Sequence, residues 1–257
     1  MLHEDRRRAE SFGAFADRYD RFRPNYPRAV FDALGSLEGK RVLDVGCGTG
    51  KAARRFADQG AAVLGIDIDE RMAAVAISHG IYVEVSSFEG WDPKGRSFDL
   101  VASGQAWHWV DPVVGPNKAA DVLRAAGRLA VFWNYGHPKD PALDDEIQKT
   151  FEETVPDLAK KYEMNRDWRS TDETMGHKEK IDRCGRFEPC EVRDFPWEWR
   201  IPAGDWLSLL QTHSDVALLS DDDRTALLAA LTLVTSRVAG DLVFEYATFS
   251  LFATKIE

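Results

Sequence analysis

The 257-residue chain is poor in cysteine and has no long apolar runs. Its three cysteines, Cys47, Cys184 and Cys190, form no Cys-x-x-Cys pair, which argues against a disulfide framework and a cysteine-based zinc site. No uninterrupted stretch of about 18 apolar residues is present, and the basic run at residues 6–8 precedes no apolar segment, so neither a membrane span nor a signal peptide is expected. These absences predict a cytoplasmic protein with reduced thiols.

Positive charge is also scarce. The chain has 33 Lys and Arg against 43 Asp and Glu, a formal net charge of −10, which disfavours sequence-independent binding to a nucleic acid. Repeats and low-complexity tracts are missing, which excludes a solenoid. With 44% hydrophobic residues, the length suits one large α/β domain with an elaboration, or two small domains.

Strand and helix patterns alternate along the chain. Short apolar runs bounded by glycines predict strands, and the segments between them predict helices, which together indicate a doubly wound α/β fold whose first half holds five βα units. The predicted strands are 41–45, 62–66, 81–85, 97–102, 127–133, 191–200 and 242–254. The predicted helices are 51–59, 70–78, 111–126, 204–211 and 222–239.

These patterns divide the chain into four parts. We expect an N-terminal helical lid at 1–37, a Rossmann-like core at 38–134, a helical cap insertion at 135–187, and strands and helices that complete the sheet at 188–257. The cap is predicted because residues 135–187 are charged and helix-leaning, with scattered Trp, Met and Pro. Such insertions usually help to build substrate pockets.

A glycine-rich turn follows the first predicted strand, with Gly46, Gly48 and Gly50 in close succession. Glycines let a ligand approach the backbone at the carboxyl end of a sheet. Asp67 lies 21 residues after Gly46, at the end of the second strand, where a carboxylate can accept hydrogen bonds from both ribose hydroxyls. A tight turn without a ligand is the plainer alternative, but the strand, turn, helix, strand and Asp together favour a nucleotide-like ligand.

At these residues the chain resembles the class I S-adenosylmethionine (SAM) dependent methyltransferases, whose first two motifs look like residues 42–50 and 65–68. The resemblance covers about residues 38–133. It implies a seven-stranded Rossmann-like sheet with its last strand antiparallel, SAM as cofactor and S-adenosylhomocysteine (SAH) as product. Neither Asp nor His spacing suggests a metal.

The resemblance assigns cofactor contacts position by position. Gly46 and Gly48 would approach the methionyl part of SAM, Asp67 would bind the ribose, and Asp44 would order the loop. Ile68, Met72 and Phe88 would pack on the adenine. The chain departs from the family at Ser87, where members often have an acidic residue, and at residues 125–127, which replace the usual Pro-Gly-Gly.

Residues 12–27 and 104–111 resemble a small-molecule subgroup that includes trans-aconitate methyltransferase-like proteins. In the first segment, aromatic residues recur at three- and four-residue spacing, which is typical of an amphipathic helix that packs on the sheet. The alternative is a lid, with the Tyr19 ring near the sulfonium and Arg23 at the SAM carboxylate.

The second segment would lie beside the transferred methyl group. It offers Gln105 as a cofactor contact, and His108 and Trp109 as catalytic candidates, although a lone histidine is more often a structural hydrogen-bond partner than a base. Trp107 is expected in the core. His79, His137, His177 and His213 have no partner pattern and are assigned to the surface or to capping.

The predicted reaction is methyl transfer to a small organic acceptor, a carboxylate or a hydroxyl, held between residues 105–111 and the cap. Two alternatives remain open at this point: an NAD-type oxidoreductase, against which Lys51 counts, and a SAM-binding protein without catalysis. The sequence gives no oligomeric state.

Overall fold

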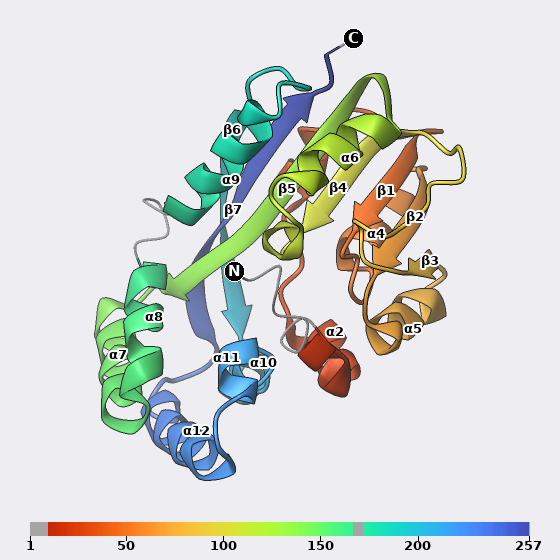
Figure 1. The fold of residues 1–257 in the computed structure, drawn as a ribbon. Coiled ribbons are helices and arrows are strands. Elements are labelled where there is room, and N and C mark those ends of the chain that lie inside the picture. The colour runs from red at the N-terminus through yellow and green to blue at the C-terminus, as the bar shows by residue number, and fades with distance from the viewer. Residues whose placement is uncertain (1–9, 167–171, 257) are drawn as a thin grey trace.

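The computed structural model describes residues 10–166 and 172–256, which form a seven-stranded sheet in the order β3-β2-β1-β4-β5-β7-β6 (Figure 1). Strands β1 to β5 are parallel, and β7 runs antiparallel to both of its neighbours, as predicted. The strands are β1 Arg41–Val45, β2 Ala62–Asp67, β3 Tyr82–Val85, β4 Phe98–Gly104, β5 Leu123–Pro138, β6 Glu191–Ile201 and β7 Leu242–Thr254.

Helices join and cover these strands. In chain order they are η2 Glu10–Phe15, α2 Ala16–Phe22, α3 Arg28–Asp32, α4 Lys51–Ala57, α5 Glu70–Ser78, η3 Trp107–Trp109, α6 Val114–Val122, α7 Pro141–Thr154, α8 Pro156–Arg166, α9 Asp172–Arg183, α10 Ala203–Leu210, α11 Ser214–Ala217 and α12 Asp221–Thr235. No described helix is long and apolar enough to cross a membrane.

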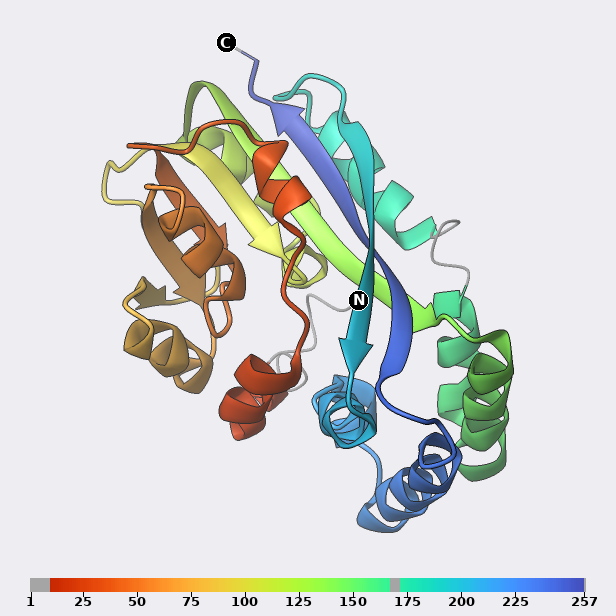
Figure 2. The ribbon, with the colours of Figure 1, turned by 180° about the vertical axis from the view of Figure 1, so that it is seen from behind.

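Alternation along the strands builds a core on each face of the sheet. In β1, Val42 belongs to one buried apolar cluster, whereas Leu43 and Val45 belong to another, because successive side chains of a strand point to opposite faces. The cluster around Val42 includes Phe31 of α3 and Phe56 of α4. Helices α6 and α9 cover the face seen in Figure 1, and α3 lies on the face seen in Figure 2.

The structure corrects the predicted boundaries of the first half. Residues 86–97 join β3 to β4 without a helix, so the prediction of five βα units is wrong there. Helix α6 is shorter than the predicted 111–126, because Leu123 already pairs with Phe98 of β4 and starts β5. The predicted N-terminal helix is split into the 3₁₀ helix η2 and the α-helix α2.

Strand β5 also runs further than predicted. Its pairing with β4 ends at Phe132, but its antiparallel pairing with β7 continues to Pro138, so the first part of the predicted cap is strand. Beyond it, α7 and α8 pack with α10 and α12 around a separate apolar cluster that includes Ile147, Phe151 and Leu227. Figure 1 shows this helical group at the far end of β5, β6 and β7 from the chain's C-terminus.

Candidate active site

Two adjoining cavities, of about 330 and 40 Å³, lie at the carboxyl ends of β1, β2 and β4. Ligands of doubly wound sheets bind at this edge. The larger cavity is lined by eight of the predicted cofactor residues: Tyr19, Gly46, Gly48, Asp67, Ile68, Met72, Phe88 and Gln105. The smaller cavity adds the remaining two, Arg23 and Asp44. The structure therefore brings together every residue that the family resemblance assigned to the cofactor.

The glycine turn lets the main chain itself form part of the cavity wall, because its glycines carry no side chains. Gly46 and Gly48 have φ angles of +66° and +54°, in the left-handed region that glycine tolerates best. A Cβ atom on Gly46 would lie 2.4 Å from the Cβ of Ala106. On Gly48 it would meet Cε of Met72 at 3.4 Å. A side chain at position 46 would therefore displace the loop that carries Gln105.

Asp67 at the end of β2 is held by two backbone N–H groups. Gly48 N donates to its Oδ2 at 2.7 Å, and Asp69 N donates to its Oδ1 at 2.9 Å. Burial nevertheless raises the pKa of this carboxyl to about 6. Each carboxylate oxygen has a second lone pair, so Asp67 can still accept hydrogen bonds from the two hydroxyls of a ribose.

Asp44 of β1 is a buried carboxyl on the wall of the smaller cavity. Neither of its oxygens has a hydrogen-bond partner within the part of the chain that the structure describes. Burial, and to a lesser degree the charge of Asp67, raises its pKa to about 8. An unpaired buried carboxylate is costly, so this wall favours a ligand that brings a cation or a hydrogen-bond donor.

The N-terminal helices supply aromatic walls. Phe12 lies edge-on to Tyr19, with ring centroids 6.0 Å apart, and edge-on to Trp109 at 6.3 Å. All three side chains line the larger cavity. Residues of η2 and α2 thus close it together with η3.

Arg23 lines the smaller cavity but is anchored elsewhere. Its Nε donates to Oγ1 of Thr212 at 2.8 Å and its Nη2 to the carbonyl of Thr212 at 2.9 Å, while the guanidinium lies 5.1 Å from the Tyr19 ring centroid. These contacts tie the end of α2 to the segment that follows α10. Lys51, which the sequence reasoning did not place in the site, also lines this cavity and donates to the carbonyl of Asp20 at 2.6 Å.

His108 is not on the wall of either cavity. Its Nδ1 accepts a hydrogen bond from Nε1 of Trp133, and its ring lies 5.1 Å from that of Trp109. His177 of α9 stacks on Trp133 at 5.2 Å. His177 is buried, which lowers its pKa to about 4, so its assignment to the surface is wrong. Trp107 is buried, as predicted.

The predicted cap lies elsewhere. No described residue between 135 and 187 lines the two cavities. Helices α7 and α8 instead bury their apolar faces against α10 and α12, which removes from water the side chains that a cap would turn toward a ligand.

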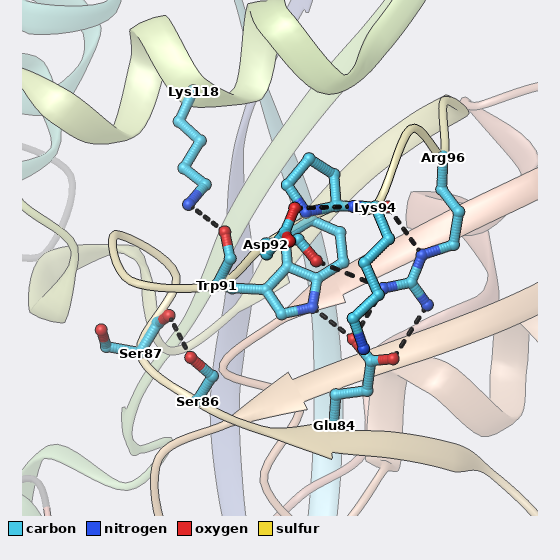
Figure 3. A network of polar contacts seen from close by, with 9 residues as sticks. Glu84, Ser86, Ser87, Trp91, Asp92, Lys94, Arg96 and Lys118 are labelled. Carbon is cyan, nitrogen blue, oxygen red and sulfur yellow. Dashed lines mark hydrogen bonds and ion pairs between the residues drawn. The ribbon is translucent and has the colours of Figure 1, made fainter.

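The loop after β3 forms the wall at Phe88, and a polar network fixes its course (Figure 3). Glu84 accepts two hydrogen bonds from Arg96, at 2.9 and 2.8 Å, and a third from Nε1 of Trp91. The bonds from Arg96 contribute most to lowering the pKa of Glu84, to about 2. Lys118 donates to the carbonyls of Glu89 and Trp91. This network spans both ends of the loop and presents Phe88 to the cavity.

Sequence reasoning missed two acidic residues on the wall of the larger cavity, Glu89 and Asp111. Glu89 Oε1 accepts the backbone N–H of Asp111 at 2.7 Å, which connects the loop after β3 to the segment after η3. Neither spacing nor periodicity marks such a contact between loops. Within residues 10–166 and 172–256, no group of three potential metal ligands occurs.

Comparison with known proteins agrees with this geometry. Residues 42–127 match a family model described as a methyltransferase domain. This stretch is therefore similar to a methyltransferase domain, and the sheet that contains it has the strand order of the class I methyltransferase fold. It is 38% identical over 127 residues to an uncharacterised methyltransferase of Mycobacterium tuberculosis, which covers 48% of this chain and 52% of that protein. It is 48% identical over 118 residues to a ubiquinone biosynthesis O-methyltransferase of Alkalilimnicola ehrlichii, which covers 43% and 48%. The chain thus spans about half the length of these curated relatives.

Solved structures share the fold over a longer stretch. A putative type II methyltransferase from Anaeromyxobacter dehalogenans superposes with a TM-score of 0.67 at 23% identity, covering 91% of this chain and 99% of that one. Phosphoethanolamine N-methyltransferase 2 of Haemonchus contortus, in complex with SAM, gives a TM-score of 0.56 at 20% identity over 100% of this chain and 60% of that one. The fold of this chain is therefore the class I methyltransferase fold, with β7 inserted antiparallel between β5 and β6.

Proposed function

We propose that the protein is a SAM-dependent methyltransferase that acts on a small organic acceptor. The observation that carries this proposal is the convergence of Asp67, the bare glycine turn and the buried Asp44 on two joined cavities. The match of residues 42–127 to a methyltransferase domain supports it, as do solved structures of the same fold that hold SAM or SAH.

The residues present fit SAM at both ends. Asp67 would accept the ribose hydroxyls, and Ile68, Met72 and Phe88 offer apolar side chains for the adenine. At the other end, the unpartnered oxygens of Asp44 suit the α-ammonium group of the methionyl part. Arg23 lies on the same cavity and could meet the carboxylate only by giving up or sharing its bonds to Thr212.

SAM supplies a methyl group on a sulfonium, which leaves as a neutral thioether when a nucleophile attacks in line. The chain's part is to orient the acceptor and to exclude water, which are the main protein contributions in a reaction of this kind. Phe12, Tyr19 and Trp109 do this in our proposal, because their rings form a continuous aromatic wall.

The acceptor is proposed to be a small molecule with a carboxylate or a hydroxyl nucleophile. The segments 12–27 and 104–111, which resemble the trans-aconitate methyltransferase-like subgroup, both contribute residues to the larger cavity. Trp109 is proposed to position the acceptor as part of the wall, and His108 to act behind it through hydrogen bonding.

The test is incubation of the purified protein with methyl-labelled SAM and a library of metabolites, followed by identification of labelled products by mass. Asp67→Asn serves as the matched variant with a damaged cofactor site. We expect a labelled small molecule from the wild type and much less from the variant. SAH binding without any product would favour a SAM-binding protein without catalysis, and binding of NADH in place of SAH would contradict the proposal.

A further inference from the structure

We propose that Asp69 is a positioning residue that connects the ribose-binding carboxylate to the N-terminal wall of the cavity. The inference rests on the proposed function, because it concerns how the cofactor site is held together. Asp69 itself does not line either cavity. It acts through two residues that do, Asp67 and Phe12, the neighbour of Gly13.

The backbone of Asp69 fixes Asp67. Its N–H donates to Oδ1 of Asp67 at 2.9 Å, while Gly48 N holds Oδ2 at 2.7 Å. With one N–H on each oxygen, the plane of the Asp67 carboxylate is set before a ligand arrives. The position of Asp69 therefore determines one of the two contacts that orient the ribose-binding group.

The side chain of Asp69 holds the N-terminal segment. Its Oδ2 accepts the backbone N–H of Gly13 at 3.1 Å, a contact across 56 residues of sequence. A Cβ atom on Gly13 would lie 2.2 Å from this same oxygen and 2.3 Å from Nε of Arg71, so the approach requires glycine. Since Gly13 follows Phe12 directly, this contact also places the Phe12 ring beside Tyr19 and Trp109.

Several contacts hold the carboxylate of Asp69 in place. It is only 5% exposed, caps the N-terminus of α5 by accepting the N–H of Arg71 at 2.9 Å, and pairs with the Arg71 guanidinium at 2.8 Å. Other contacts tie α2 to the core, among them Asp20 with Arg54 at 2.7 Å. Asp69 differs from Asp20 because its own backbone N–H is bonded to Asp67, so a shift at Gly13 reaches the proposed ribose-binding carboxylate.

Asp69→Ser separates the two roles of the side chain. Serine is also a good N-cap, so α5 should still begin at the same residue. Its hydroxyl is too short, however, to cap the helix and to accept the N–H of Gly13 at the same time. We expect SAH to bind about tenfold more weakly and the KM for SAM to rise by a similar factor, because a hydrogen bond to a charged acceptor is lost. The unfolding midpoint of the ligand-free protein should change little. Asp140→Ser, at the N-cap of α7, is the matched control and should leave SAH affinity unchanged.

Gly13→Ala disrupts the same contact from the N-terminal segment. Its control is Gly204→Ala, where a Cβ atom would meet nothing within 4 Å. Because Asp69→Ser and Gly13→Ala remove one contact, the double variant should bind SAH about as weakly as the weaker single variant. Additive losses, or unchanged SAH affinity in Asp69→Ser, would overturn the proposal. Failure of the wild type to bind SAH would instead contradict the proposed function on which it rests.

Discussion

The indole N–H of Trp133 donates a hydrogen bond to Nδ1 of His108, with the two nitrogens 3.2 Å apart. An indole N–H can only donate, so Nδ1 of His108 must carry a lone pair, and in the neutral ring the proton sits on Nε2. The neutral ring of His108 therefore cannot act as a base while this bond is intact. A carboxylate acceptor, which needs no base, is consistent with such a ring.

This relationship predicts the tautomer of His108. Nitrogen-15 NMR of the ligand-free protein at neutral pH should show the Nε2–H form, and Trp133→Phe should allow the Nδ1–H form to appear because the donor has gone. His137, whose Nδ1 lies 2.9 Å from a carbonyl, is an internal control that should show the proton on Nδ1. An Nδ1–H signal for His108 in the wild type would contradict the assignment.

Replacing Asp67 tests the ribose site. Asp67→Ala removes a charged acceptor of hydrogen bonds worth about 1.5–3 kcal/mol, so SAH affinity measured by calorimetry should fall by roughly tenfold to a hundredfold. Asp99→Ala is a matched control, because this carboxylate also accepts a backbone N–H, from Arg41, but lies at the start of β4 rather than at the carboxyl edge. The control should lose stability and keep its SAH affinity. Equal affinity of Asp67→Ala and wild type would remove Asp67 from the site.

Asp44 should make the ligand-free protein less stable as the pH rises. Its pKa is about 8 in the folded protein and 3.8 in the unfolded chain. Between these two pH values the folded state holds a proton that the unfolded chain has lost, so raising the pH favours unfolding. His177 and Lys51 act in the opposite direction, because burial lowers their pKa values from 6.5 to about 4 and from 10.5 to about 8, so the unfolded chain keeps their protons to higher pH. The contribution of Asp44 is therefore measured as the unfolding midpoint of the wild type relative to that of a variant without this carboxyl, and this difference should fall between about pH 6.5 and 8.

Asp44→Asn removes this titration, so the midpoint of the variant should have a more positive slope with pH than that of the wild type over the same interval. Thermal unfolding followed by circular dichroism at several pH values gives the comparison. A variant with the same slope as the wild type would count against a protonated Asp44 in the folded protein.

Trp109 separates acceptor binding from cofactor binding. Trp109→Ala removes the ring that faces Phe12, so turnover should drop with little change in SAH affinity, because acceptor positioning is lost and the polar cofactor contacts are kept. Trp109→Phe keeps an aromatic wall and should restore most of the turnover. Weakened SAH binding with normal turnover at saturation would instead place Trp109 in the cofactor site.

The cavity lining at the glycine turn was predictable from sequence because its residues follow strand ends. Gly46, Gly48 and Asp67 lie where parallel strands deliver them to one edge, and local pattern suffices to find them. Strand β7 was likewise predicted at 242–254, since its apolar run is bounded by turn residues.

The remaining differences arise from contacts between distant segments. Nothing local in residues 135–138 signals that β7 will pair with them, so the end of β5 was assigned to a cap. His177 had no partner pattern because its partner, Trp133, lies on another element. The contact between Gly13 and Asp69 joins the 3₁₀ helix η2 to the N-cap of α5, and neither local sequence signals it.

The length of β5 has a consequence for how the chain is divided into packing units. Its 16 residues rise about 50 Å at roughly 3.3 Å each, so the strand belongs to the cofactor core at one end and to the helical group of α7, α8, α10 and α12 at the other. That group has its own apolar cluster, and none of its described side chains lines either cavity. The family match ends at residue 127, inside β5, so the strand continues well beyond the matched stretch. One strand therefore belongs to two packing units, which are also joined by the bonds of Arg23 to Thr212.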